Sequence, residues 1–203
     1  SFPRLFEPGR IGRLEVRNRI ISAPMERNYC NRDGSVTQRY IDYLEARARG
    51  GVGCFFTEAS YVDARGKGRA FQLGVHDDAM IPGLKRLVQA VHRHGARIGL
   101  ELNYGGRVVA PEVSSLQPWA PSPVPCQMSG GAMPHALTLE EIQRIIRMFG
   151  EAARRSLEAG CDIIEIHGAH GYLVGQFLSA LTNQRTDAYG GPLTNRMRFL
   201  MEV

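Results

Sequence analysis

Four short apolar runs, rich in residues that favour β-strands, recur along the chain, and a stretch with helical spacing follows each of them. The runs cover residues 18–25, 53–60, 97–102 and 162–167. The helical stretches cover residues 37–49, 80–94, 139–159 and 173–181, and a further helix is predicted from Arg196 onward. Strands that alternate with helices are typical of βαβ units, and strands apolar almost throughout are buried on both faces of a parallel sheet. The pattern therefore predicts an α/β fold.

Residues at the ends of the predicted helices support their limits. Thr37 stands where an N-cap is expected, and Thr138 with Glu141 three positions later has the spacing of a capping box. Gly95 and Gly160 follow two of the helices, as glycines that end a helix do. Between the third strand and its helix, residues 107–135 are rich in Pro and Ser and are predicted to form a long loop.

Composition narrows the class of protein. The 203 residues are 43% hydrophobic and 22% charged, which suits one ordinary core, and no stretch approaches the roughly 18 apolar residues of a membrane span. The first residues lack a signal-peptide pattern, so we expect a cytoplasmic protein that does not bind membranes. The net charge of +5 is spread singly, which speaks against nucleic-acid binding. Four distant cysteines without a C-x-x-C spacing indicate reduced thiols.

Polar residues stand at the end of each predicted strand, where burying a polar group without a hydrogen-bond partner costs free energy. They are Glu26, Glu58, Glu101 with Asn103, and His167 with His170. A doubly wound sheet and a barrel both fit the element order, but the glycine-rich nucleotide fingerprints of a doubly wound sheet are absent. In a barrel these strand ends would lie on one face, which is where barrel enzymes have their active sites. The alternative is that each polar residue only caps its own loop.

The densest group of reactive side chains is the segment 166–173, with the sequence IHGAHGYL. His167 and His170 lie three positions apart at a turn from strand to helix, and Tyr172 lies two positions further on. Neutral imidazoles can donate to a carbonyl oxygen, and a phenol can donate a proton. A zinc site would need a third ligand and a spacing of the H-E-x-x-H type, and neither is present.

Several segments together are similar to a known family. They are LFEP at 5–8, APM at 23–25, HGAHGYL at 167–173 and TNQRTDAYGG at 182–191. In content and order they resemble the old yellow enzyme family of flavin-dependent ene-reductases, which also includes 2,4-dienoyl-CoA reductase. The resemblance extends over essentially all 203 residues.

The resemblance implies a (β/α)₈ barrel with FMN at its C-terminal mouth, of which this chain holds roughly the first four β/α units. Residues 1–203 would then be the N-terminal half of an FMN-binding barrel domain. It further implies that the flavin is contacted, mostly through backbone, by Ala23, Pro24, Met25 and Glu26. Ala59 would lie beside the ring, and Glu101 takes the place of a glutamine that bonds the pyrimidine edge.

The same resemblance gives the reacting residues their roles. His167 and His170 match the pair that holds the substrate's carbonyl oxygen, and Tyr172 matches the proton donor. NADH or NADPH would reduce the flavin, which would pass the hydride to the activated C=C bond of a small-molecule α,β-unsaturated carbonyl, enoate or enoyl compound. The cysteines of any iron–sulfur cluster would lie in a C-terminal extension beyond residue 203.

Three residues depart from the family pattern. Glu26 stands where many members have Thr or Cys, Glu101 replaces the glutamine, and Tyr104 replaces a histidine. The sequence ELNYGG at 101–106 is closer to the amine dehydrogenase branch, which leaves amine oxidation as an alternative. That branch attaches its flavin through a cysteine, and the aligned residue here is Glu26.

Chain length gives a second alternative. A full barrel takes roughly 250 residues, and the family's FMN phosphate site and a further flavin-contacting arginine lie in the half that is absent here. A half-barrel would expose apolar edges, so we expect a homo-oligomer, and a non-catalytic scaffold remains an alternative function. An aldolase-like barrel would need a lysine at a strand end, where neither Lys67 nor Lys85 stands.

Overall fold

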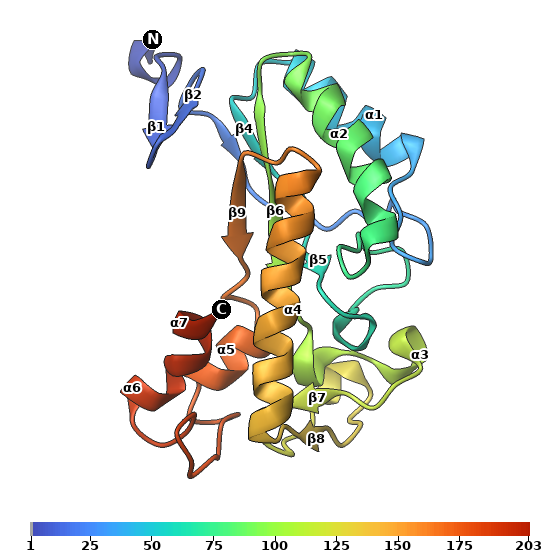
Figure 1. Ribbon diagram of the computed structural model, residues 1–203, viewed down its shortest axis with the longest axis vertical. Coiled ribbons are helices and arrows are strands. Elements are labelled where there is room, and N and C mark those ends of the chain that lie inside the picture. The colour runs from blue at the N-terminus through green and yellow to red at the C-terminus, as the bar shows by residue number, and fades with distance from the viewer. Residues whose placement is uncertain (1) are drawn as a thin grey trace. The chain divides into compact units, whose positions relative to one another are not determined.

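The computed structural model describes residues 2–203 and divides them into two compact units (Figure 1). The first unit comprises the residues up to 60 together with 71–101 and 153–165. The second comprises 61–70, 102–152 and 166–203. Each unit is described by itself below.

The parallel sheet contains the four predicted strands. They are β3 (Ile21–Ser22), β4 (Cys54–Phe56), β6 (Arg97–Asn103) and β9 (Ile163–Ile166). β4 pairs in parallel with β3 and with β6, and β9 also pairs with β6. The short strand β5 (Ser60–Tyr61) pairs with β6 as well, so the predicted run 53–60 is interrupted after Phe56. A helix follows each of the four strands, which confirms the α/β class and the four β/α units.

Two helices of the first unit lie side by side (Figure 1). They are α1 (Gln38–Arg49) and α2 (Ile81–His92), the latter preceded by the 3-10 turn η3 (Asp78–Met80). Thr37 caps α1 by accepting the backbone N–H of Tyr40, as predicted. The helical spacing of the apolar residues is explained by burial: Tyr40, Ile41, Leu44, Leu84, Leu87, Val88 and Val91 are all in the core.

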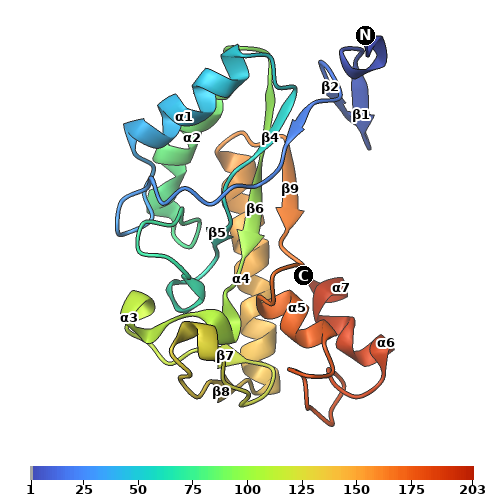
Figure 2. The same ribbon diagram turned by 180° about the vertical axis from the view of Figure 1, so that it is seen from behind.

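The chain forms a hairpin near its N-terminus that the sequence did not predict (Figure 2). The 3-10 turn η1 (Pro3–Leu5) comes first, and β1 (Gly9–Ile11) then pairs antiparallel with β2 (Leu14–Val16). The turn between the strands uses Gly12 at a φ of +58°, a conformation that favours glycine.

Polar side chains close the ends of the helices in the first unit. Arg17 donates to the backbone oxygens of Ala48 and Val52, just where α1 ends. Asp162 accepts the backbone N–H of Ile98 and contacts the His92 ring, with an Nε2–Oδ2 distance of 2.7 Å. His92, the last residue of α2, thus has a carboxylate partner.

The second unit contains most of α4 (Leu139–Glu158), whose capping box is confirmed. Glu141 accepts the backbone N–H of Thr138 at 2.8 Å and donates its own to the Thr138 hydroxyl at 3.2 Å. The predicted loop 107–135 is not fully irregular. It holds η4 (Gly106–Val108), α3 (Pro111–Ser114), β7 (Trp119–Ala120) and η5 (Gln127–Ser129), and β7 pairs in parallel with β8 (His135–Ala136). The 3-10 turn η2 (Ala64–Gly66) also belongs to this unit.

The last helices are shorter than the periodicity predicted. α5 (Leu173–Leu178) ends three residues early, because Ser179 adopts an extended conformation. Instead of one helix from Arg196, there are two, α6 (Leu193–Arg196) and α7 (Arg198–Glu202). Periodicity finds such elements but places their ends poorly when the helix is only one or two turns long.

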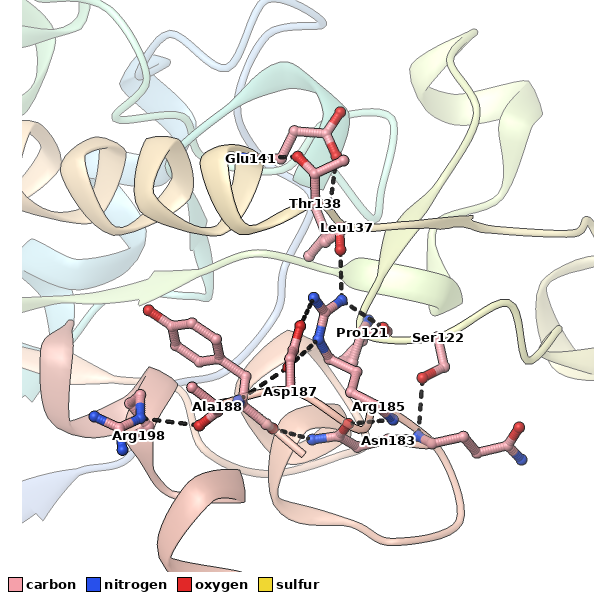
Figure 3. A network of polar contacts seen from close by, with 12 residues as sticks. Pro121, Ser122, Leu137, Thr138, Glu141, Asn183, Arg185, Asp187, Ala188 and Arg198 are labelled. Carbon is pink, nitrogen blue, oxygen red and sulfur yellow. Dashed lines mark hydrogen bonds and ion pairs between the residues drawn. The ribbon is translucent and has the colours of Figure 1, made fainter. Parts of the chain in front are cut away.

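The loop between α5 and α6 is anchored by an arginine (Figure 3). Arg185 forms an ion pair with Asp187 and donates to the backbone oxygens of Pro121 and Leu137. The hydrogen bonds from Arg185 lower the pKa of the Asp187 carboxyl. These contacts are those of a loop anchor.

The approach of β6 to β9 depends on a residue without a side chain. A Cβ atom on Gly99 would lie 2.6 Å from the backbone oxygen of Ile163 and 3.0 Å from the Phe56 ring. We expect Gly99→Ala to lower the free energy of unfolding by about 1–3 kcal/mol, because the added methyl overpacks two strands. Urea denaturation measures the change.

Gly150 provides the matched control. It lies exposed in α4, and a Cβ there would meet no atom within 4 Å. Gly150→Ala should raise the free energy of unfolding by about 0.5–1 kcal/mol, as expected inside a helix. Equal effects of the two substitutions would contradict the close contact between β6 and β9.

Candidate functional site

The predicted oxygen-binding residues lie where β9 ends and α5 begins, in the second unit. The backbone N–H of His167 donates to the oxygen of Leu102 at 3.0 Å, which fixes the end of the strand. The chain then turns through His170 and Gly171, with φ angles of +54° and +72°. A left-handed histidine is uncommon outside special turns, so this turn is a specific feature of the segment.

Three rings converge at this turn. The ring centroids of His167 and Tyr172 are 4.9 Å apart, and those of the two histidines are 5.1 Å apart. The Nδ1 atom of His170 lies 3.4 Å from the Nε2 atom of His167. His167 is buried, Tyr172 is half-buried and His170 is exposed. The structure thus brings the three predicted residues together, while their catalytic and binding roles stay predictions.

Gln176 holds this turn in place and was missed by the sequence analysis. Its side chain is buried and donates to the backbone oxygens of Gly105 and Gly171 at 3.1 and 2.7 Å. Its Oε1 atom accepts the backbone N–H of Arg107 at 3.1 Å. The available signal was a polar residue on the otherwise apolar face of the predicted helix 173–181.

The chemistry of the three rings is that of hydrogen-bond donors. Imidazole and phenol groups can donate to a carbonyl or phenolate oxygen held between them. Within residues 2–203, no group of three His, Cys, Asp or Glu side chains is placed to hold a metal ion.

The predicted flavin-contact residues all belong to the first unit. The segment 23–26 follows β3; Ala23, Met25 and Glu26 are exposed and Pro24 is half-buried. Ala59, after β4, and Glu101, in β6, are both buried. The structure therefore places the flavin-contact residues in one unit and the three rings in the other.

Glu58 ties the segment after β3 to the loop after β4. Its carboxylate accepts the backbone N–H groups of Arg27, Asn28 and Leu73. Burial raises the pKa of this carboxyl, against the lowering effect of the three hydrogen bonds. The sequence marked Glu58 as a polar strand-end residue, but its partners lie 15 or more positions away and could not be read from it.

Comparison with known proteins identifies the family of the chain. Residues 4–203 match the NADH:flavin oxidoreductase / NADH oxidase family. The chain belongs to this family. Its members are FMN-dependent oxidoreductases that use NADH or NADPH. The resemblance to old yellow enzymes found in the sequence is thereby confirmed.

Individual members of the NADH:flavin oxidoreductase family show how far the match extends. The chain is 51% identical over 204 residues to an NADH oxidase of Thermoanaerobacter brockii, covering all of this chain and 31% of that protein. Among solved structures, a 2-naphthoyl-CoA reductase complex superposes with a TM-score of 0.94 at 32% identity. That match covers the whole chain and 33% of the reductase.

An old yellow enzyme homologue from Zymomonas mobilis superposes with a TM-score of 0.90 at 36% identity, over 98% of this chain and 58% of that one. The chain thus spans between about a third and three fifths of the length of these relatives. None of the helices described between residues 2 and 203 is long and apolar enough to cross a bilayer.

Tyr104, which departs from the family pattern, has a packing role. Its side chain is 1% exposed and fits against Gly66, where a Cβ would lie 2.8 Å from the ring. Its hydroxyl has no hydrogen-bond partner among the described residues, and burial raises its pKa far above the usual range. This phenol stays neutral and buried.

The four cysteines are free thiols, as expected. Burial raises the pKa of Cys54 to about 11 and that of Cys161 to about 12. Both are therefore protonated and unreactive near neutral pH. Cys30 is buried, and its Sγ atom lies 3.7 Å from the Oε1 atom of Glu58.

Proposed function

We propose that residues 1–203 form the N-terminal half of an FMN-binding barrel, in an enzyme that uses NADH or NADPH to reduce the activated C=C bond of an α,β-unsaturated carbonyl, enoate or enoyl compound. The convergence of His167, His170 and Tyr172 at one turn supports the proposal best. We expect the substrate to be a small molecule and the enzyme to be a homo-oligomer.

The first unit has features that suit a flavin ring. The segment 23–26, in which Ala23, Met25 and Glu26 are exposed, offers backbone groups, and the buried Ala59 has a side chain small enough to leave room for a flat ring beside it. Glu101 supplies an acceptor for the flavin N3–H, although an ionised carboxylate cannot donate as glutamine does. When bound, FMN supplies the hydride transfer from the nicotinamide to the alkene.

The three rings of the second unit supply the rest of the chemistry. His167 and His170 donate hydrogen bonds to the substrate's carbonyl oxygen. These bonds strengthen as the oxygen gains enolate character, so they stabilise the transition state more than the ground state. Tyr172 protonates the α-carbon and completes the addition.

Amine oxidation is less well supported. The related dehydrogenases resemble this chain at residues 101–106, but the structure explains Tyr104 by its packing against Gly66. A covalent flavin link needs an available thiol, whereas Cys30 is 4% exposed and directed at Glu58. Alkene reduction therefore remains our proposal.

Native mass spectrometry of the protein purified from its own source tests the cofactor and the oligomer together. We expect FMN to be released on denaturation and the native mass to be a multiple of the chain mass. A colourless protein that does not oxidise NADH or NADPH would favour the scaffold alternative and overturn the proposal.

Replacing both histidines tests the oxygen site. His167→Ala combined with His170→Ala should weaken the binding of a phenolic ligand about tenfold or more while leaving FMN bound, because two donors are lost. Spectral titration measures both ligands. His170→Asn is the matched control, since asparagine keeps an N–H donor and tolerates a positive φ. Unchanged phenol affinity in the double variant would remove the pair from this role.

Tyr172→Phe tests the proton donor. We expect alkene turnover to fall by about 10²-fold, the usual scale for losing a general acid, while flavin reduction by the nicotinamide is spared. Stopped-flow absorbance follows the two half-reactions separately. Equal losses in both would show that Tyr172 has a different role.

A further inference from the structure

Glu58 is a buried carboxylate that bonds to the backbone rather than to a cation. The residue lies two positions after β4 and is 1% exposed. The Oε2 atom accepts the N–H groups of Arg27 at 2.6 Å and Asn28 at 3.1 Å. The Oε1 atom accepts the N–H of Leu73 at 3.1 Å and faces the thiol of Cys30. Within residues 2–203, no Arg, Lys or His forms an ion pair with it.

This arrangement requires an anion that only accepts hydrogen bonds. Two successive N–H groups converge on one oxygen, and Asn28 has a φ of +56°. Such concave pairs of backbone donors are typical anion-binding features. An amide in place of the carboxylate would direct an NH₂ group at a backbone donor, and an apolar residue would leave all three N–H groups without a partner.

The contacts lie next to both proposed flavin-contacting stretches of the first unit. The segment 23–26 immediately precedes Arg27, and Ala59 immediately follows Glu58. The backbone N–H of Glu58 itself donates to the Tyr40 hydroxyl at 2.9 Å. The Glu58 side chain is thus hydrogen-bonded to the end of the first stretch, and its backbone leads directly into the second.

We propose that Glu58 positions the segment 23–28 for the flavin ring, an inference that rests on the proposed FMN site. Within the segment, the ring of Pro24 restricts the backbone only at residues 23 and 24, so the end of the segment needs another restraint. Glu58 fixes the N–H groups at the end of the segment 23–28. It thereby sets the direction of the peptide groups that precede them.

Asp162 allows positioning to be separated from general stability. It is a second nearly buried carboxylate of the first unit that accepts a backbone N–H, that of Ile98 at 3.0 Å. It lies before β9, and its contacts with His92, Arg97 and Ile98 include none of the residues assigned to the flavin. Asp162→Asn should therefore reduce stability without affecting FMN binding.

The experiment compares the variants Glu58→Gln and Asp162→Asn, each made in the full-length natural protein. FMN is removed and titrated back while flavin fluorescence is followed, and thermal unfolding is measured in parallel. We expect Glu58→Gln to weaken FMN binding roughly tenfold or more and Asp162→Asn to leave it within about twofold. Hydrogen exchange at the amides of Arg27 and Asn28 should accelerate only in Glu58→Gln.

Unchanged FMN affinity in Glu58→Gln, or equal losses in both variants, would overturn the positioning role while leaving the proposed function intact. A wild-type protein that binds no FMN would overturn both. Should Glu58→Gln fail to fold, Glu58→Asp replaces it in the comparison. It keeps the charge but is one methylene too short to reach all three donors, so the same weakening is expected.

Discussion

Backbone N–H and C=O groups that are shielded from water must find partners, and in the loops of this chain buried and half-buried polar side chains provide them. Glu58 accepts three backbone N–H groups, Arg17 and Arg185 donate to backbone oxygens at loop and helix ends, and Gln176 does both. Removing one such side chain leaves several backbone groups unsatisfied. The conformations of the loops that carry the candidate site residues therefore depend on these few polar side chains.

This constraint divides the polar residues at the strand ends into two kinds. Glu58 is committed to backbone groups, whereas the rings of His167, His170 and Tyr172 contact one another in edge-on and tilted arrangements at a turn that Gln176 holds. The loop-cap interpretation fits Glu58, and the site interpretation stays a prediction for the three rings. Rigid loops suit the proposed chemistry, because donors fixed in advance need no reorganisation as charge develops on the substrate.

Local features were predictable because their determinants lie close together in sequence. The caps at Thr37 and Thr138 and the three rings of residues 167–172 each fall within a few positions. The N-terminal hairpin was missed because its strands are only three residues long, too short to show an alternating pattern. The partners of Glu58 lie 15 to 31 positions away, so only the folded chain could show them.

Backbone positioning also explains how this chain can depart from its family at Glu26. In the proposed arrangement, the segment 23–28 is held by hydrogen bonds from the backbone N–H groups of Arg27 and Asn28 to Glu58, and the side chain at position 26 forms neither bond. Glu26 acts on this anchor through its charge, which adds to the rise in the pKa of Glu58. Ionised, it disfavours negative charge on a nearby flavin, so the substitution would act on the reduction potential rather than on the shape of the site.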